Sequence, residues 1–147
     1  MKLLIIDNYD SFTYNLVELL RQCKVDDYTI MKNDKINFNA IESFDKIILS
    51  PGPGQPAQAG MMAEFLKKYA YTKSILGICL GHQAIAERFG GKIIQLDDIL
   101  HGVASVATIL NNDILFKDIP TEIEIGRYHS WIVEKNSLPK ELEITAI

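Results

Sequence analysis

Residues 74–82 read SILGICLGH and pass from an apolar strand pattern directly into a helical one. Their centre, Gly77-Ile78-Cys79-Leu80-Gly81, has the glycine-x-nucleophile-x-glycine spacing of a sharp strand-to-helix turn, with cysteine at the nucleophile position. The flanking glycines let the strand and the helix approach closely, because they carry no Cβ atom. The turn therefore predicts that the Cys79 thiol lies at the carboxyl end of a parallel sheet, where open α/β folds place their ligands.

Two neighbours of Cys79 predict its chemistry. The amide of Leu80 follows the nucleophile directly and is placed to hold a developing oxyanion. The helix expected over residues 82–89 directs its N-terminal amides at the sulfur, which favours the thiolate. The alternative is a buried cysteine that acts only as a small hydrophobic residue, as most free cysteines do.

The first 91 residues alternate short apolar runs with helical patterns, which is typical of an α/β fold with an open, mostly parallel sheet flanked by helices. The predicted strands span residues 3–7, 28–32, 46–50 and 74–78, with the first at the centre. Asp10 or Ser11 is expected to cap the first helix. A short helix is expected over residues 39–44. The expected buried faces of the two longer helices are Phe12, Leu16, Leu19, Leu20 and Cys23, and then Met62, Phe65, Leu66 and Tyr69.

The pattern changes after Gly91, where short strand-like runs follow one another. The runs span residues 92–96, 105–110, 122–127 and 141–147. They predict an antiparallel extension of the sheet within a single domain over residues 1–147. The alternation of apolar and polar residues continues up to Ile147, so the domain is expected to be incomplete at its C-terminus.

Composition and charge narrow the classes of function. The 147 residues carry a net charge of −4 and no basic cluster, so no nucleic-acid partner is expected. No apolar run has the length of a membrane span, so no membrane partner is expected. The two cysteines, Cys23 and Cys79, stand in unrelated contexts and indicate a reducing cytoplasm rather than a disulfide framework. Neither a metal nor a cofactor is expected, because no aspartate has metal-type spacing with a histidine.

A second glycine-rich segment, Pro51-Gly52-Pro53-Gly54, follows the strand expected next to that of the nucleophile. Glycines between prolines give a rigid loop whose backbone amides can approach a ligand. This is what a second oxyanion donor requires. Taken alone, an ordinary tight turn explains the segment better, since Pro-Gly turns are common.

None of the three histidines is an evident base for Cys79. His82 lies in the first turn of the expected helix, which points away from the sulfur. His101 has no catalytic neighbour in sequence, and His129 is interpreted as a hydrogen-bonded structural residue. The residues thus predict a nucleophile without its base.

Four segments resemble one family, the class I glutamine amidotransferases. Residues 6–16 are similar to the opening of component II of anthranilate synthase and of 4-amino-4-deoxychorismate synthase. Residues 49–56 resemble the oxyanion loop of these proteins, residues 77–83 their nucleophile motif, and residues 126–131 their Arg-Tyr-His-Ser segment. The segments occur in family order over nearly the whole chain, so together they are highly specific.

The resemblance implies a flavodoxin-like amidotransferase fold and a role for each matching residue. Cys79 would attack the carboxamide of L-glutamine and form a thioester, while the amides of Gly52 and Leu80 hold the oxyanion. Ammonia would pass to a chorismate-binding synthase partner, component I, with anthranilate synthase the first expectation. The residues implied in glutamine binding are Gly54, Gln83, Ser130 and Trp131.

The family also carries a His-Pro-Glu-Ser type motif that completes a Cys-His-Glu triad, and this sequence has no such motif. Because general acid–base help contributes roughly a hundred- to ten-thousand-fold, this chain alone is expected to be a poor glutaminase. Two alternatives remain open from the sequence. One is a catalytically impaired module of the same fold that binds glutamine or a partner, and the other is a different cysteine hydrolase.

Overall fold

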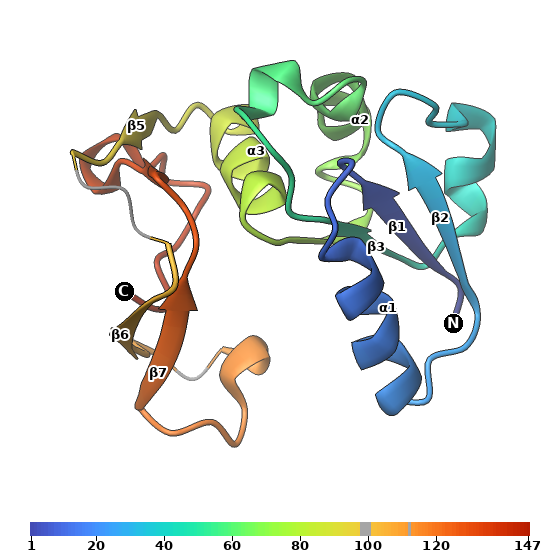
Figure 1. Cartoon of the computed structure of the whole chain (residues 1–147). Coiled ribbons are helices and arrows are strands. Elements are labelled where there is room, and N and C mark those ends of the chain that lie inside the picture. The colour runs from blue at the N-terminus through green and yellow to red at the C-terminus, as the bar shows by residue number, and fades with distance from the viewer. Residues whose placement is uncertain (98–100, 112) are drawn as a thin grey trace. The chain divides into compact units, whose positions relative to one another are not determined.

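The computed structural model describes residues 1–97, 101–111 and 113–147, which form two compact units, Met1–Arg88 and Phe89–Ile147 (Figure 1). The first unit holds the parallel sheet and the second holds the antiparallel strands. The single domain over residues 1–147 stays a prediction.

The first unit is built on a four-stranded parallel sheet in the order β2-β1-β3-β4. The strands are β1 (Leu3–Asp7), β2 (Tyr28–Lys32), β3 (Lys46–Leu49) and β4 (Ser74–Gly77). Each was predicted from its apolar run, and the central place of β1 is confirmed. Because β1 pairs with both β2 and β3, the chain winds in opposite directions from it, and the carboxyl ends of β1 and β3 form a topological switch point.

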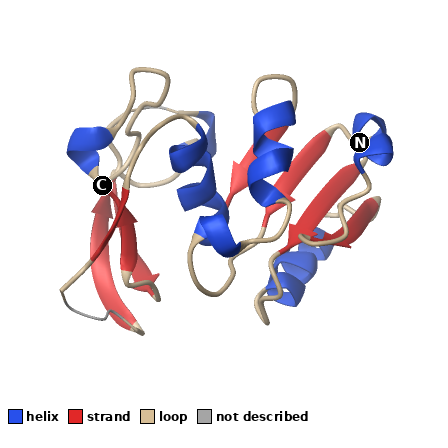
Figure 2. Cartoon of the chain, turned by 90° about the horizontal axis from the view of Figure 1, so that it is seen from above, coloured by secondary structure: helices blue, strands red, loops and turns tan. Residues whose placement is uncertain are grey.

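Helices lie on both sides of this sheet (Figure 2). They are α1 (Thr13–Gln22), α2 (Met62–Tyr69) and α3 (Leu80–Arg88), with the 3-10 helices η1 (Phe38–Ser43) and η2 (Pro56–Gln58). The predicted helices over 39–44 and after Cys79 are therefore confirmed, although α3 begins two residues earlier than expected.

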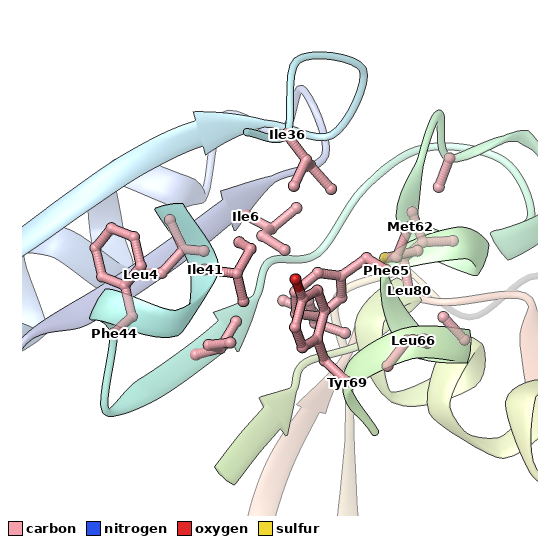
Figure 3. Close-up of a cluster of buried hydrophobic side chains, with 14 residues drawn as sticks. Leu4, Ile6, Ile36, Ile41, Phe44, Met62, Phe65, Leu66, Tyr69 and Leu80 are labelled. Atoms are coloured by element: carbon pink, nitrogen blue, oxygen red, sulfur yellow. The ribbon is translucent and has the colours of Figure 1, made fainter. Parts of the chain in front are cut away.

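The larger core cluster lies between the sheet and the helices η1, α2 and α3 (Figure 3). Leu4 and Ile6 of β1 project into it because alternate residues of a strand share a face. All four residues predicted for the buried face of α2 are in this cluster, namely Met62, Phe65, Leu66 and Tyr69. Leu80 also belongs to it, so the residue after Cys79 is anchored in the core.

The opposite face of the sheet packs against α1, and here the predicted buried face is partly wrong. Val17 is the buried apolar residue of α1, with Leu16 and Leu20 partly buried beside Leu3 and Ile5 of β1. The predicted core residues Phe12, Leu19 and Cys23 are exposed instead. Apolar residues surround more of α1 than the sheet can cover, so some of them remain exposed. Cys23 lies after the last residue of the helix.

The expected side-chain cap of α1 is also wrong. Phe12 occupies the N-cap position, and no side chain caps the helix. Asp10 instead accepts a hydrogen bond from the amide of Phe12 at 2.7 Å, which closes the turn before the helix. Thr13, the first helical residue, donates its hydroxyl to Asp7 at 2.9 Å.

In the second unit the described strands form two small antiparallel sheets rather than an extension of the parallel one. β5 (Ile93–Gln95) pairs with β8 (Trp131–Val133), and β6 (Val103–Thr108) pairs with β7 (Glu122–Arg127). The expected strand over 141–147 is wrong, because the backbone pairing there is limited to residues 145–147 against 108–110. The 3-10 helices η3 (Ile114–Phe116) and η4 (Lys135–Ser137) complete the unit.

The corrected face of α1 predicts different costs for two truncations. Val17 is 5% exposed and Leu19 is 56% exposed. We expect Val17→Ala to lower the free energy of unfolding by about 1–3 kcal/mol, because two buried methyl groups are lost and a cavity is left. Leu19→Ala should change it by less than about 0.5 kcal/mol, as for other surface positions. Urea unfolding measures both, and a larger cost for Leu19→Ala would contradict this packing.

Candidate active site

Three loops leave the carboxyl edge of the parallel sheet and meet around Cys79. They follow β1 at Asn8, β3 at Ser50 and β4 at Ile78. The amide of Ser50 donates to the carbonyl of Ile6 at 3.0 Å, and that of Ile78 donates to the carbonyl of Leu49 at 3.0 Å. The parallel pairing thus continues into the loops and brings them together.

The turn at Cys79 is as sharp as the sequence predicts. Cys79 has a φ of 50°, in the left-handed region that side chains other than glycine rarely adopt. A Cβ atom at Gly77 would lie 2.5 Å from the backbone of Gly81, and one at Gly81 would lie 2.6 Å from Leu49. Both glycines are therefore required for α3 to begin directly against β3 and β4.

The Pro51-Gly54 loop lies against the residue that follows Cys79. A Cβ atom at Gly52 would lie 2.5 Å from Cδ2 of Leu80 and 2.6 Å from Cβ of Asn8. Only glycine allows the backbone of residue 52 to approach this closely. The predicted proximity of the proline–glycine loop to the nucleophile turn is therefore found.

A buried polar network joins the loops after β1, β2 and β3. Asn8 donates its backbone N–H to Oγ of Ser50 at 2.9 Å and its side-chain Nδ2 to the Ser50 carbonyl at 2.8 Å. Asn33 donates its own Nδ2 to Oδ1 of Asn8 at 3.0 Å. All three residues are buried, so these bonds are shielded from water.

Asp7, the last residue of β1, organises the turn that follows it. Its carboxylate accepts hydrogen bonds from the Tyr9 amide at 2.8 Å and from the Thr13 hydroxyl at 2.9 Å, and it pairs with Lys32. Burial acts to raise the pKa of Asp7, but the hydrogen bonds from Lys32 and Thr13 and the Lys32 charge together hold it below its ordinary value. Asp7 therefore serves as an ionised anchor for the first loop.

The ionisation of Cys79 differs from the sequence-based expectation. Burial is the largest influence and raises the pKa of the thiol, and the negative charge of Asp10 acts in the same direction. The amide of Leu80 favours the thiolate but does not outweigh burial. The resting side chain is therefore a thiol at neutral pH, so a reaction through the sulfur needs a step that removes its proton.

A pocket of about 260 Å³ opens beside this arrangement. Asn8, Pro53 and Leu80 line it, so it borders both the proline–glycine loop and the residue after the nucleophile. Asn33 and Asp34 contribute further polar groups to its wall. The geometry is thus that of a cysteine beside the Leu80 amide, with the proline–glycine loop and a pocket of mixed polar and apolar lining next to Leu80.

The family described as glutamine amidotransferase class-I matches residues 4–147. The chain belongs to this family. A Haemophilus influenzae protein provisionally named anthranilate synthase component II is 45% identical over 147 residues, covering 100% of this chain and 76% of that protein. The aminodeoxychorismate synthase component 2 of Escherichia coli is 40% identical over 146 residues, covering 98% of this chain and 77% of that protein.

Solved structures place the fold in the same family. A Thermoplasma acidophilum protein provisionally described as part of a GMP synthase has a TM-score of 0.85 at 26% identity, covering 99% of this chain and 72% of that one. The parallel sheet with flanking helices and small antiparallel sheets is thus an amidotransferase fold, as the sequence predicts.

The first unit of this amidotransferase contains five of the residues predicted for its site. Cys79, Leu80 and Gly52 lie together as described above. Gly54 has a φ of 73° at the exposed end of the loop, which explains glycine there. Gln83 is buried in α3, and its backbone N–H donates to the backbone carbonyl of Cys79 at 3.0 Å.

The other two predicted residues belong to the second unit. Trp131 begins β8 opposite Gln95, and the carbonyl of Ser130 accepts a hydrogen bond from the Leu96 amide at 2.7 Å. The backbones of Trp131 and Ser130 are therefore held by β5 and by Leu96, the residue that follows it. Their role in a glutamine site stays a prediction.

The three histidines lie in both units of the amidotransferase, and in the first unit His82 is exposed on the first turn of α3. In the second unit, burial and then the Arg127 charge lower the pKa of His129. A backbone hydrogen bond with Trp131 acts in the opposite direction on this pKa, while Nδ1 of His129 has no hydrogen-bond partner among the described residues. The role of His129 as a hydrogen-bonded structural residue stays a prediction. His101 lies edge-on to the Tyr128 ring, with centroids 5.2 Å apart.

The network of Asn8, Asn33 and Ser50 was not predicted from the sequence. Asn8 and Ser50 lie within two of the four family-like segments; Asn8 directly follows the predicted strand over 3–7, and Ser50 is the last residue of the predicted strand over 46–50. Polar residues at that position of adjacent parallel strands meet at one edge of the sheet, and this was the available signal.

Metal-ligating clusters and membrane-spanning helices are both absent from the described part of the chain. No group of three or more His, Cys, Asp or Glu side chains there is arranged to hold a metal ion. Within the same residues, no helix has the length and apolar character needed to cross a membrane.

The close contact at Gly81 predicts a strong position effect. We expect Gly81→Ala to lower the free energy of unfolding by about 1–3 kcal/mol, because its methyl group would overlap the Leu49 backbone. Gly126→Ala is the matched control, since its methyl group would meet only the ring of exposed Tyr128 at 3.0 Å, which can move. Urea unfolding compares them, and equal costs would contradict the packing of the turn.

The raised pKa of Cys79 predicts slow alkylation at neutral pH. In a Cys23→Ser background, we expect the pH midpoint of iodoacetamide modification to lie above that of the same thiol in the urea-unfolded chain. Asp10→Asn should move the midpoint down, because the Asp10 charge acts to raise it. A midpoint below that of the unfolded chain would show that α3 and Leu80 outweigh burial.

Proposed function

We propose that this chain is a glutamine-hydrolysing subunit that supplies ammonia to a chorismate-using synthase. The observation that carries the proposal is the contact of Gly52 with Leu80, which brings the proline–glycine loop next to the Cys79 turn. Two backbone amides beside a sulfur nucleophile suit acyl transfer, in which negative charge develops on a carbonyl oxygen. The names of the relatives support glutamine as the acyl donor and chorismate chemistry as the destination of the ammonia.

The proposed reaction begins with attack by the Cys79 sulfur on the side-chain carboxamide carbon of glutamine. The carbonyl electron pair moves to oxygen, and the amides of Gly52 and Leu80 stabilise that charge. Collapse of the intermediate breaks the carbon–nitrogen bond, and the proton that the thiol gives up is transferred to the departing nitrogen. Ammonia leaves, a γ-glutamyl thioester remains, and water then releases glutamate.

The remaining predicted residues are proposed to hold the substrate. Gly54 at the end of the loop and buried Gln83 below Cys79 belong to the same unit as the nucleophile. Ser130 and Trp131 are proposed to contribute through their backbone groups. Because Cys79 is a thiol at rest, glutamine binding is proposed to precede removal of its proton.

The proposed partner is a component I protein that binds chorismate. Component II of anthranilate synthase and of aminodeoxychorismate synthase are both among the relatives, and anthranilate synthase is the first choice because more of the similar proteins carry that name. Tryptophan biosynthesis is then the proposed pathway, with folate biosynthesis second. The cytoplasm is the proposed location, supported by the two free cysteines.

Covalent labelling tests the glutamine site without requiring turnover. We expect the chloromethyl ketone analogue of glutamine to modify Cys79 stoichiometrically, with the thiol bonded to the methylene carbon and chloride released. Free glutamine should slow the reaction, and the enantiomeric D-analogue should react far more slowly. Peptide mass spectrometry locates the adduct, and Cys23→Ser serves as the control because Cys23 is the other free thiol.

The same experiment separates the alternatives. A different cysteine hydrolase would show no protection by glutamine, and this result would contradict the proposal. Protected labelling without ammonia release, even with a chorismate-binding partner added, would indicate the impaired binding module. Glutamate release that increases on addition of that partner would support the complete proposal.

A further inference from the structure

The carboxamide of Asn8 connects the end of the central strand to the beginning of the proline–glycine loop. Asn8 directly follows β1, is 2% exposed, and donates both its backbone and side-chain N–H groups to Ser50. Ser50 is fully buried, and its hydroxyl donates in turn to the Pro51 carbonyl at 2.6 Å. The first peptide of the loop is therefore bonded to Asn8 through Ser50.

The other end of the Asn8 side chain is equally fixed. Its Oδ1 accepts from Asn33, whose backbone is held on both sides. The backbone N–H of Asn33 donates to the backbone carbonyl of Asp7 at 3.0 Å, and the backbone carbonyl of Asn33 accepts from the Met61 N–H at 2.8 Å. Because one side of the Asn8 carboxamide must accept and the other must donate, its orientation is determined.

Asn8 also touches the loop directly. A Cβ atom added at Gly52 would lie 2.6 Å from Cβ of Asn8 and 3.1 Å from the backbone carbonyl oxygen of Asn8. It would also lie 2.5 Å from Cδ2 of Leu80. Gly52 is thus enclosed between Asn8 and the residue after the nucleophile. The contact is made by Cβ and the backbone carbonyl of Asn8, so its carboxamide acts on the loop through Ser50.

We infer that Asn8 is a positioning residue for the proposed glutamine hydrolysis: its bonds to Ser50 and its contact with Gly52 set the direction of the Gly52 amide toward the oxyanion. This inference rests on the proposed function and adds a residue to which no role was assigned. Asn8 acts through the loop and makes no bond to the reacting atoms.

A positioning role differs from a purely structural one in what it changes. The oxyanion forms only during the reaction, in the tetrahedral intermediate and the transition states around it, so a misdirected Gly52 amide slows the chemical step while ground-state binding is retained. Misplacement by about 1 Å can cost about a hundredfold in rate. General loss of stability would instead lower the folded fraction without separating the two constants.

Inactivation kinetics with the chloromethyl ketone analogue of glutamine give that separation. The thiolate forms a bond to the methylene carbon as chloride leaves with the electron pair of the C–Cl bond, while the adjacent ketone oxygen lies where the oxyanion forms. The variants are Asn8→Ala and Asn8→Asp, which at neutral pH have no side-chain donor for the Ser50 carbonyl but keep the backbone N–H that donates to Oγ of Ser50. Thr13→Val is the matched control, because it also removes one buried hydrogen bond, the one to Asp7.

We expect both Asn8 variants to lower kinact by about tenfold or more, within the range seen when oxyanion donors are disturbed. KI should stay within about twofold, and Thr13→Val should leave both constants near the original values. Ser50→Ala removes the hydroxyl that joins the Asn8 backbone amide to the Pro51 carbonyl but keeps the bond from the Asn8 side chain to the Ser50 carbonyl, and it should also lower kinact. Thermal unfolding, followed by circular dichroism, sets the temperature at which all variants are folded.

The inference is overturned if kinact of the Asn8 variants is unchanged, or falls no more than in Thr13→Val. If neither Asn8 variant folds, Ser50→Ala decides, and an unchanged kinact in that variant also overturns it. Failure of the proposed function has a different appearance, since the unsubstituted chain would then escape labelling at Cys79 or show no protection by glutamine.

Discussion

The candidate site depends on one steric constraint: α3 can begin at Leu80 only because Gly77 and Gly81 leave no Cβ atoms in its way. Gly81 lies against Leu49 of β3, and Gly77 lies against Gly81, so the turn is pressed between two strands and its own helix. Cys79 accepts a left-handed backbone as a result. The same closeness brings Leu80 into the core and against Gly52, so packing positions both Cys79 and the loop.

Buried hydrogen bonds, in addition to packing, hold the loops at the carboxyl edge of the sheet. The loops after β1, β2 and β3 are joined by buried bonds between Asn8, Asn33 and Ser50, and Asp7 holds the first loop through its carboxylate. A buried amide network of this kind is stable only when each donor and acceptor has a partner. It is therefore a rigid support for the loop whose backbone amides are proposed to stabilise a developing charge. Burial has a different consequence at Cys79. It raises the pKa of the thiol, so the side chain is protonated at rest.

Much of this arrangement could be predicted from the sequence, because glycine spacing and apolar runs report local constraints. The four parallel strands, the buried face of α2 and the turn at Cys79 follow from such patterns. The face of α1 could not be predicted, since apolar residues surround more of that helix than the sheet covers, and Leu19 and Cys23 are exposed. Nor could the pairing of residues 145–147 or the net pKa of Cys79, which depend on contacts between distant segments.

The position of the carbonyl oxygen in a covalent complex tests this account most directly. The measurement is a crystal structure of the chain after Cys79 has reacted with the chloromethyl ketone analogue of glutamine. The account predicts that the ketone oxygen lies about 2.7–3.1 Å from the backbone nitrogens of both Gly52 and Leu80. An oxygen directed into solvent, with the Pro51-Gly54 loop out of hydrogen-bonding reach, would contradict it.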